Sequence, residues 1–396
     1  MSIIINGGGM TGAILALMLS KLTKGDLEIS LIEQHSPYCY DTKLSSNIYP
    51  PHVIALSRGA YSELIRINMA SILSSCSTVI KQVEISEYHR LHKIFINAQD
   101  YQLSELGYVI ELNIFKKKLF DFLHKKSTVT VYCPATLQKI KRGKKNNIII
   151  LNNGHQIISK LMVAADGTDS TLASNCGIKW FRWNYQQTAI VSKITTEIPH
   201  FGRAFEKFTE HGPLAILPIA NDFSFLIWCI SDKQKKEVST WKKDKFSQEL
   251  QNVFGWKLGK ILDVGKRYFY DLWLTRANSH ISHRLALVGN AAQSLHPIAG
   301  QGFNLGLRDI VVLSKIITQA LYQNVDIGDY SVLNTYQKHR YLDQYRTITI
   351  TDGLVRLFSN HCLPLIIARS MGLFFVHYST FLRRLLVNTI LNWKTD

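Results

Sequence analysis

The sequence has few of the features that mark proteins stabilised by disulfides or zinc, or proteins whose domains are joined by flexible linkers. Its six cysteines are scattered over 396 residues and form no C-x-x-C pair. This spacing excludes a disulfide framework or zinc ribbon and favours a reducing compartment. Internal repeats, low-complexity segments and Pro/Gly/Ser-rich linkers are also missing. We therefore expect structural units that are built from interleaved segments of the chain, not domains joined by linkers.

Long apolar runs are missing too. The nearest candidate, residues 362–376, is interrupted by Arg369 and Ser370, and it falls short of the roughly 18–20 apolar residues that span a bilayer. A strand pattern begins at residue 2, so no secretory signal is expected. Residues 362–396 mix aromatic and aliphatic side chains with arginines. That composition fits equally a helix on a membrane interface and a helix packed on its own protein. We expect a cytoplasmic protein, either peripheral to the inner face of the membrane or free of it.

Acidic residues are scarce, with 29 Asp and Glu against 46 Lys and Arg, which gives a net charge of +17. The lysine clusters at 116–118, 141–145 and 233–243 show no aromatic interleaving and no helix-turn-helix pattern. We therefore interpret them as solvated surface and expect no nucleic-acid partner. The closely spaced pair His280 and His283 lacks a neighbouring Cys or acidic set, so no metal site is expected.

The chain begins with a pattern typical of dinucleotide-binding folds. Residues 2–6 form an apolar run that predicts a buried parallel strand, and residues 7–12 match G-x-G-x-x-G. An apolar helix is predicted over 13–22, and a second strand over 27–32 ends at Glu33. A lone glycine motif is weak, but the strand, helix, second strand and terminal acid all stand in the expected order. The alternative is a glycine-rich turn that packs a helix on a sheet and binds nothing.

Each residue of this motif has a physical role. Gly7 permits the sharp turn, Gly9 lets a pyrophosphate approach the backbone, and Gly12 lets helix and strand pack closely. Met10 lies in the same loop, where the helix N-terminus offers free N–H groups and a positive dipole end. Glu33 is placed to accept hydrogen bonds from a ribose.

Two further strand–turn motifs follow later in the chain. The strand predicted over 161–165 ends in Asp166-Gly167, and that over 285–288 ends in Gly289-Asn290. Each places a glycine and a polar side chain directly after a buried strand.

A rigid loop precedes the helix predicted over about 303–323. His296, Pro297, Gly300 and Gly302 occupy this loop, and Phe303-Asn304 opens the helix. Exposed N–H groups at the positive end of a helix can stabilise negative charge on a flavin ring. His296, Pro297 and Gly300 are the candidates for contact with substrate or flavin, and for His296 an ordinary structural role remains equally open.

The three motifs together resemble those of the flavoprotein aromatic hydroxylases related to para-hydroxybenzoate hydroxylase. The resemblance implies that the first motif holds the ADP part of FAD. It also implies that Asp166-Gly167 lies near both FAD and the pyridine nucleotide, and that Gly289-Asn290 binds the ribityl chain. The resemblance places Gly302, Phe303 and Asn304 in the same expected cofactor-binding set. Two positions depart from the pattern, because Asn290 replaces the usual aspartate and His52 stands where an arginine is expected. His52 can offer one hydrogen bond but not a guanidinium fork.

Segments with no flavin role narrow the resemblance to the ubiquinone-biosynthesis hydroxylases. These segments are residues 202–209, 211–218, 254–260, 296–306 and 328–330. Within that group the match is closest to enzymes acting on 2-polyprenyl-6-methoxyphenol, in which Gly-Asn looks normal. The similarity covers essentially the whole chain.

The resemblance implies an FAD-dependent monooxygenase. NAD(P)H would be the co-substrate, O₂ would react through a C4a-hydroperoxyflavin, and a polyprenyl phenol would be hydroxylated on its ring. Other ubiquinone-biosynthesis proteins are the implied partners. Two alternatives stay open. One is another FAD enzyme of this fold, acting at a different ring carbon or as a prenyl reductase. The other is a non-catalytic flavoprotein scaffold.

The expected fold class is α/β. A Rossmann-like FAD-binding domain is expected from three separate segments, with an inserted, mostly antiparallel sheet domain for the substrate and a helical C-terminal region. The boundaries we predict are 1–75, 100–180 and 275–330 for the FAD-binding domain, 76–99 and 181–274 for the sheet domain, and 331–396 for the helical region.

Overall fold

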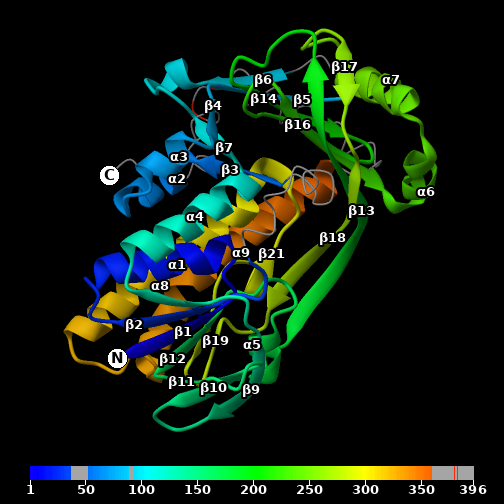
Figure 1. Cartoon of the computed structure of the whole chain (residues 1–396). Coiled ribbons are helices and arrows are strands. Elements are labelled where there is room, and N and C mark those ends of the chain that lie inside the picture. The colour runs from blue at the N-terminus through cyan, green and yellow to red at the C-terminus, as the bar shows by residue number, and fades with distance from the viewer. Residues whose placement is uncertain (37–51, 89–92, 359–378, 380, 382–396) are drawn as a thin grey trace.

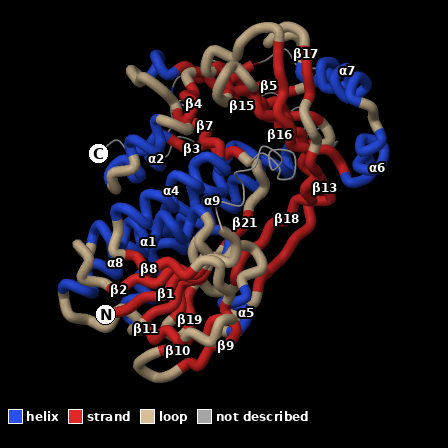
Figure 2. The backbone as a smooth tube through the Cα atoms, viewed as in Figure 1, coloured by secondary structure: helices blue, strands red, loops and turns tan. Residues whose placement is uncertain are grey.

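The computed structural model describes residues 1–36, 52–88, 93–358, 379 and 381 (Figure 1). Along these residues the chain builds two main sheets, which lie at opposite ends of the molecule and are bridged by helices and two long strands (Figure 2). In the described part of the chain, no helix is both long and apolar enough to cross a membrane.

The first sheet carries the N-terminal motif. Its strand order is β19-β20-β12-β1-β2-β8, and all neighbours are parallel except β19 and β20. The strands are β1 (Ser2–Asn6), β2 (Glu28–Ile32), β8 (Val129–Tyr132), β12 (Leu161–Ala164), β19 (Ile281–Ser282) and β20 (Leu285–Leu287). The pairing of β1 with β12 and of β12 with β20 confirms that segments distant in the sequence form one parallel sheet.

Both faces of this sheet are covered, which explains why β1 is apolar at consecutive positions. Ile3 and Ile5 pack against the helices α1, α4 and α8, whereas Ile4 packs on the opposite side with Ile149 and Leu151. The helices are α1 (Met10–Leu22), α4 (Leu112–Lys126) and α8 (Gln301–Tyr322). The opposite layer contains β9 (Leu137–Arg142), β10 (Asn147–Leu151), β11 (Gln156–Ser159) and the short α5 (Thr171–Asn175).

The second sheet is larger and mostly antiparallel, in the order β21-β18-β13-β16-β15-β14-β5-β6, with β17 paired to β13. Its strands are β5 (Gln82–Glu87), β6 (Lys93–Asn97), β13 (Trp180–Thr196), β14 (Arg203–Thr209), β15 (Gly212–Pro218), β16 (Ser224–Ser231), β17 (Ile261–Val264), β18 (Tyr268–Ala277) and β21 (Gln293–Ser294). Helices α6 (Asp232–Thr240) and α7 (Lys243–Phe254) cover one face through Val238, Phe246, Leu250 and Phe254. The other face borders a cavity.

A small sheet connects the two. It consists of β3 (Val53–Ser57), β7 (Gly107–Glu111) and β4 (Ser77–Ile80), accompanied by α2 (Arg58–Arg66) and α3 (Ala70–Ser74). We expected residues 76–99 to belong wholly to the large sheet. In the structure β4 pairs with β7 instead, whereas β5 and β6 join the large sheet. Conversely, β21 pairs with β18, although residues 275–330 were assigned to the FAD-binding domain.

Helix α9 (Tyr330–Phe358) follows α8 and packs against it. The α/β class and the mostly antiparallel inserted sheet are confirmed. Of the helical region predicted over 331–396, α9 covers the first part, and most of residues 359–396 lies outside the described residues.

Candidate active site

A polar cleft of about 760 Å³ lies where the predicted motifs converge. It sits beyond the carboxyl ends of β1, β2 and β12, the usual ligand position in open α/β sheets. Most of the predicted cofactor-binding residues line it: Gly7, Gly9, Met10, Glu33, Asp166, Gly167, Gly289, Asn290, Gly302 and Phe303. Motifs separated by more than 100 residues in sequence thus share one site.

The geometry of the first motif gives each glycine a different constraint. A Cβ on Gly12 would lie 1.9 Å from the Gly7 carbonyl oxygen, so close helix–strand packing requires glycine there. Gly7 has φ +102°, and its Cβ would lie 2.5 Å from the Ala165 carbonyl oxygen. A Cβ on Gly9 would meet no atom within 4 Å, because it would point into open space. That space is the room the predicted pyrophosphate needs.

Two helix N-termini face the cleft. Gly9 is the N-cap of α1 and Gly300 that of α8, and neither cap offers a side-chain hydrogen bond. Neither helix has an acidic residue in its first turn. The first N–H groups of a helix have no partner within the helix, and the dipole makes that end positive. Both ends are therefore suited to anionic groups.

Acidic side chains line other parts of the cleft. Glu33 is buried, and its Oε1 accepts a hydrogen bond from the His35 backbone N–H at 3.2 Å and lies 3.5 Å from the Lys116 Nζ. The Oδ2 of Asp166 accepts from the Asn6 amide at 2.8 Å. The Asp166 Oδ1 is buried and has no hydrogen-bond partner among the described residues. A ligand hydroxyl or amide would satisfy this oxygen.

The Gly289-Asn290 turn is held from behind by a buried carboxylate. Gly289 has φ +60°, and its N–H donates to the Asp309 Oδ2 at 3.1 Å. The Asp309 Oδ1 pairs with the Arg340 Nε at 2.7 Å, and both side chains are at most 3% exposed. Asn290 is exposed toward the cleft. The ion pair between α8 and α9 therefore fixes the backbone that presents Asn290.

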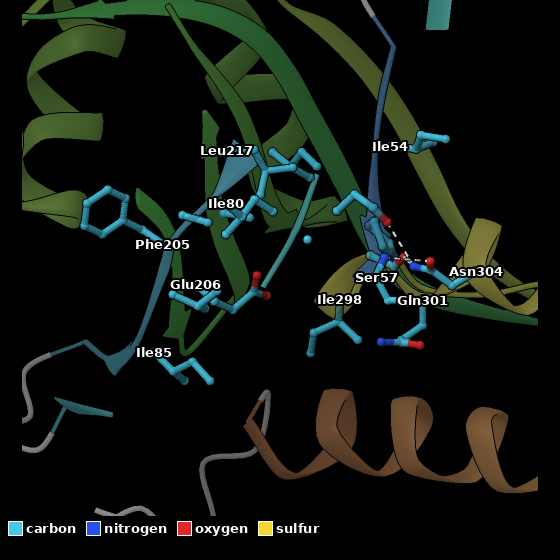
Figure 3. Close-up of a pocket in the computed structure, with 18 of the residues that line it drawn as sticks. Ile54, Ser57, Ile80, Ile85, Phe205, Glu206, Leu217, Ile298, Gln301 and Asn304 are labelled. Atoms are coloured by element: carbon cyan, nitrogen blue, oxygen red, sulfur yellow. Dashed lines mark hydrogen bonds between the residues drawn. The ribbon is translucent and has the colours of Figure 1, made fainter. Parts of the chain in front are cut away.

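A second, apolar cavity of about 570 Å³ adjoins the cleft (Figure 3). Ile54, Gly302 and Phe303 line both spaces, so they form the boundary between them. The apolar cavity is lined mainly by aliphatic and aromatic side chains from the small sheet, the large sheet, residues 297–304 at the start of α8 and the end of α9. These include Ile80, Val83, Ile85, Phe205, Leu217, Ile298, Leu354 and Phe358. Pro297 and Gly300, two of the predicted substrate-facing residues, line this cavity as well.

Asn304 connects β3 with the start of α8, close to the boundary between the polar cleft and the apolar cavity. Its Oδ1 accepts from the Ser57 backbone N–H at 2.9 Å, and its Nδ2 donates to the carbonyls of Ala55 and Gly300 (Figure 3). These bonds tie β3 to the start of α8. Asn304 lines the apolar cavity rather than the polar cleft, and its role as a cofactor ligand stays a prediction.

His296 is placed behind the site and lines neither space. It is 1% exposed, and its ring lies 3.0 Å (Nε2) from the Gln187 Oε1, while its Nδ1 accepts from the Ile298 N–H. Burial lowers the pKa of His296 to about 3, so the ring is neutral at physiological pH. Nε2 therefore carries the proton that it donates to Gln187. The hydrogen bond at Nδ1 connects the histidine to Ile298, which does line the apolar cavity.

His52 also lines neither space. Its ring packs on Tyr270 with centroids 5.7 Å apart, and its Nε2 lies 3.4 Å from the Tyr270 hydroxyl. The predicted contact between His52 and the cofactor stays a prediction.

The free energy of unfolding should decrease as the pH is lowered, because two histidines are buried in the neutral form. Burial lowers the pKa of His296 to about 3 and that of His280 to about 4. In the unfolded chain both titrate near 6.5. As the pH falls below 6.5, the unfolded state takes up protons first, so the stabilisation present above that pH is lost. Each histidine contributes about 1.4 kcal/mol per pH unit, or about 4 kcal/mol for both at pH 5.

Urea unfolding at pH 7 and pH 5 measures this loss. In His296→Gln about one proton fewer should be taken up on unfolding, so the free energy of unfolding should depend less steeply on pH. His155→Gln, at an exposed position, should leave this slope unchanged. An equal slope in all three proteins would contradict the assignment.

Several residues of the site gave no signal in the sequence. The lining of the apolar cavity comes from strands of two sheets and from the end of α9, which lie far apart in the sequence. Asp309 and Arg340 lie within helices where charged residues are ordinary. Their burial together depends on how α8 and α9 pack.

The cleft satisfies the requirements of FAD at several points. It offers open space at Gly9, helix N-termini for the phosphates, a buried oxygen of Asp166 without a partner, and a neighbouring apolar cavity for a substrate. Within the described ranges, no cluster of three or more His, Cys, Asp or Glu side chains is arranged to hold a metal ion.

Comparison with known proteins agrees with this chemistry. Residues 124–348 match the family model described as an FAD binding domain. The ubiquinone hydroxylase UbiL of Rhodospirillum rubrum is 32% identical over 372 residues, covering 94% of this chain and 85% of the relative. The 3-demethoxyubiquinol 3-hydroxylase of Escherichia coli is 27% identical, covering 96% of each chain. The p-nitrophenol 4-monooxygenase PnpA from Pseudomonas putida shares the fold, with a TM-score of 0.80 at 14% identity over 100% of this chain and 98% of that one.

These matches confirm the resemblance to the ubiquinone-biosynthesis hydroxylases that the sequence motifs indicated. Because the family model spans more than half of the chain and the UbiL match spans nearly all of it, the chain belongs to the FAD-dependent hydroxylases of ubiquinone biosynthesis and is a flavoprotein monooxygenase.

Proposed function

We propose that this enzyme hydroxylates the aromatic ring of 2-polyprenyl-6-methoxyphenol, using NAD(P)H and O₂. The observation that carries the proposal is the shared boundary of the two spaces at Ile54, Gly302 and Phe303. An apolar cavity that opens onto a dinucleotide cleft suits a largely hydrophobic ring substrate beside a redox cofactor.

When bound, FAD supplies the electron transfer and oxygen activation. The chain's own residues bind and orient. The N–H groups at the start of α1 bind the phosphates, and Gly9 leaves room for them. The N-terminus of α8, beginning beyond Gly300, offers N–H groups and a positive dipole end where the cleft meets the cavity.

The apolar lining excludes water and holds the substrate. Side chains such as Ile80, Ile85 and Leu217 surround the ring site with few polar groups, which protects a reactive oxygen species from wasteful discharge. Burial of a prenyl tail contributes about 0.8 kcal/mol per CH₂ group. Leu354, Leu357 and Phe358 at the end of α9 extend this apolar surface.

A polyprenyl substrate resides in membrane, and we extend the proposal to a peripheral location on an anionic membrane surface. The basic, aromatic residues 362–396 are the segment proposed to dock there, and nearly all of them lie outside the described residues. Other proteins of ubiquinone biosynthesis are the proposed partners.

One preparation tests the proposal. The purified protein should be yellow or become so with FAD, and NAD(P)H oxidation should rise when a polyprenyl methoxyphenol is supplied in anionic vesicles. Mass analysis of the product should show one added oxygen on the ring. Addition of hydrogen to the prenyl tail would instead indicate a reductase, and FAD binding without substrate-stimulated oxidation would indicate a scaffold. Removing residues 362–396 should lower cosedimentation with the vesicles while FAD binding persists.

A further inference from the structure

We propose that the loops at the outer end of the large sheet dock on an anionic lipid bilayer, with Phe201 and Trp256 entering the headgroup region. The inference rests on the proposed function, because it names the surface through which the enzyme would reach a membrane-resident substrate. It concerns described residues of the folded unit, whereas the segment 362–396 lies almost wholly outside them. Figure 1 shows β17 at the end of the molecule opposite β1 and β2.

Large apolar side chains gather at this end of the sheet. Four of them are between 40% and 69% exposed: Ile198, Phe201, Trp256 and Leu262. The Ile198 N–H donates to the Leu258 carbonyl at 3.0 Å, two residues beyond Trp256. Thr196 pairs with Ile261, which precedes Leu262. The four side chains therefore form one patch, the apolar loop patch. A single exposed apolar residue is ordinary, but a contiguous group marks an interaction surface.

The charges around the apolar loop patch are mainly positive. The basic side chains that border it are Lys81, Arg203, Lys243, Lys257 and Lys260, and the acidic ones are Glu84, Glu197 and Asp263. Glu84 and Asp263 are paired with Lys257 and Lys243. The Glu197 Oε2 accepts from the Lys260 backbone N–H at 2.8 Å. Each carboxylate is thus engaged within the protein, and the exposed ammonium groups of Lys81 and Lys260 face outward.

This combination of side chains suits an anionic bilayer. Aromatic rings are stable at the level of the headgroups, where one part of the ring is in an apolar environment and the other is wet. Lysines reach from such a position to anionic headgroups, which attract them. The net charge of +17 on the whole chain has the same sign. Apolar anchors within a basic rim are the pattern of a protein that lies on a membrane surface.

Docking at the apolar loop patch would also bring the bilayer close to the apolar cavity. Ile80 and Ala204 line that cavity. Ile80 directly precedes Lys81, whose N–H donates to the Gly202 carbonyl at 2.8 Å. Ala204 lies three residues after Phe201, which is about 10 Å along an extended chain. A prenyl tail would therefore need only a short path from the bilayer to the cavity.

Cosedimentation with vesicles tests the inference on the FAD-loaded, full-length protein. The vesicles are phosphatidylcholine with or without phosphatidylglycerol. Trp256→Ser should weaken binding to the anionic vesicles about 10- to 100-fold, the factor for burying one large apolar side chain. Phe201→Asn should act similarly, and asparagine is chosen because Phe201 has φ +49°, which asparagine tolerates. Lys81→Gln/Lys260→Gln should weaken binding only where phosphatidylglycerol is present.

Phe181→Ser is the matched control. Phe181 is 57% exposed and lies at the opposite end of β13 from Ile198, so this variant should bind vesicles as the parent does. The inference is overturned if Trp256→Ser and Phe201→Asn bind as tightly as the parent, or if Phe181→Ser loses as much. It is equally overturned if vesicle binding is unchanged while Trp256→Ser breaks up a dimer of the parent, because the patch would then join two copies of the chain.

Turnover separates this inference from the proposed function. Phe201 and Trp256 line neither the polar cleft nor the apolar cavity. Their variants should therefore oxidise NAD(P)H like the parent when a short-tailed, water-soluble methoxyphenol is supplied without vesicles, and should lose turnover only of a long-tailed substrate held in anionic vesicles. If the parent turns over neither substrate, the proposed function fails, whereas the vesicle-binding series still decides the docking surface.

Discussion

Gly9→Val is expected to fold normally and to lose its FAD. The backbone of Gly9 has φ −61° and ψ −177°, a conformation that valine adopts readily, and the new Cβ would meet no protein atom within 4 Å. The isopropyl group would instead fill the space that the diphosphate requires. Loss of two charge-assisted hydrogen bonds at about 1.5–3 kcal/mol each weakens binding by roughly 10²- to 10⁴-fold. The purified variant should be colourless and should stay so in micromolar FAD.

Gly353→Val supplies the matched control. Gly353 lies in the C-terminal part of α9, is exposed, and a Cβ there also meets no atom within 4 Å. This variant should keep both its yellow colour and its melting temperature. Gly12→Val should fail differently, because its Cβ overlaps the Gly7 carbonyl and the fold itself should be lost. Full FAD binding by Gly9→Val would show that the phosphates lie elsewhere.

Arg340→Met is expected to destabilise the protein by about 3–5 kcal/mol, the usual result when one partner of a buried ion pair is removed. The variant leaves the Asp309 carboxylate at 0% exposure without its cation. Because the Asp309 Oδ2 also accepts from the Gly289 N–H, the turn that presents Asn290 should loosen, and FAD affinity should fall as well. Urea unfolding and FAD titration measure the two effects.

The exposed pair Arg356–Asp352 on the same helix offers a comparison. The Arg356 Nε lies 2.8 Å from the Asp352 Oδ2, but the arginine side chain is 62% exposed. Such a pair contributes less than about 1 kcal/mol, so Arg356→Met should be nearly neutral. The double variant Asp309→Asn/Arg340→Met should recover part of the lost stability, since it removes the buried charge. If Arg340→Met changed the free energy of unfolding as little as Arg356→Met does, the Asp309–Arg340 pair would not hold the Gly289 turn in place.

The sequence by itself determined the dinucleotide-binding unit. The strand ending at Asn6, the glycines at 7, 9 and 12 and the helix after them lie within about twenty residues, and their constraints are local. Close packing needs a missing Cβ at Gly12, and an anion needs open backbone at Gly9. The Asp166-Gly167 and Gly289-Asn290 turns each follow a buried strand, and the resemblance to the aromatic hydroxylases implied that they share one site.

Only the tertiary structure decided what surrounds that unit. Glu206 faces the apolar cavity because β14 pairs with β5 and β15 in one register, and a shift of one residue would have turned Lys207 inward instead. The sequence left open whether His296 has a functional or a structural role, and the fold buries the ring where it accepts a hydrogen bond from the Ile298 N–H. The pairing of Asp309 with Arg340 spans 31 positions and depends on how two helices cross. Burial and partnership of polar groups arise from contacts between distant segments, and a local pattern of residues carries no record of them.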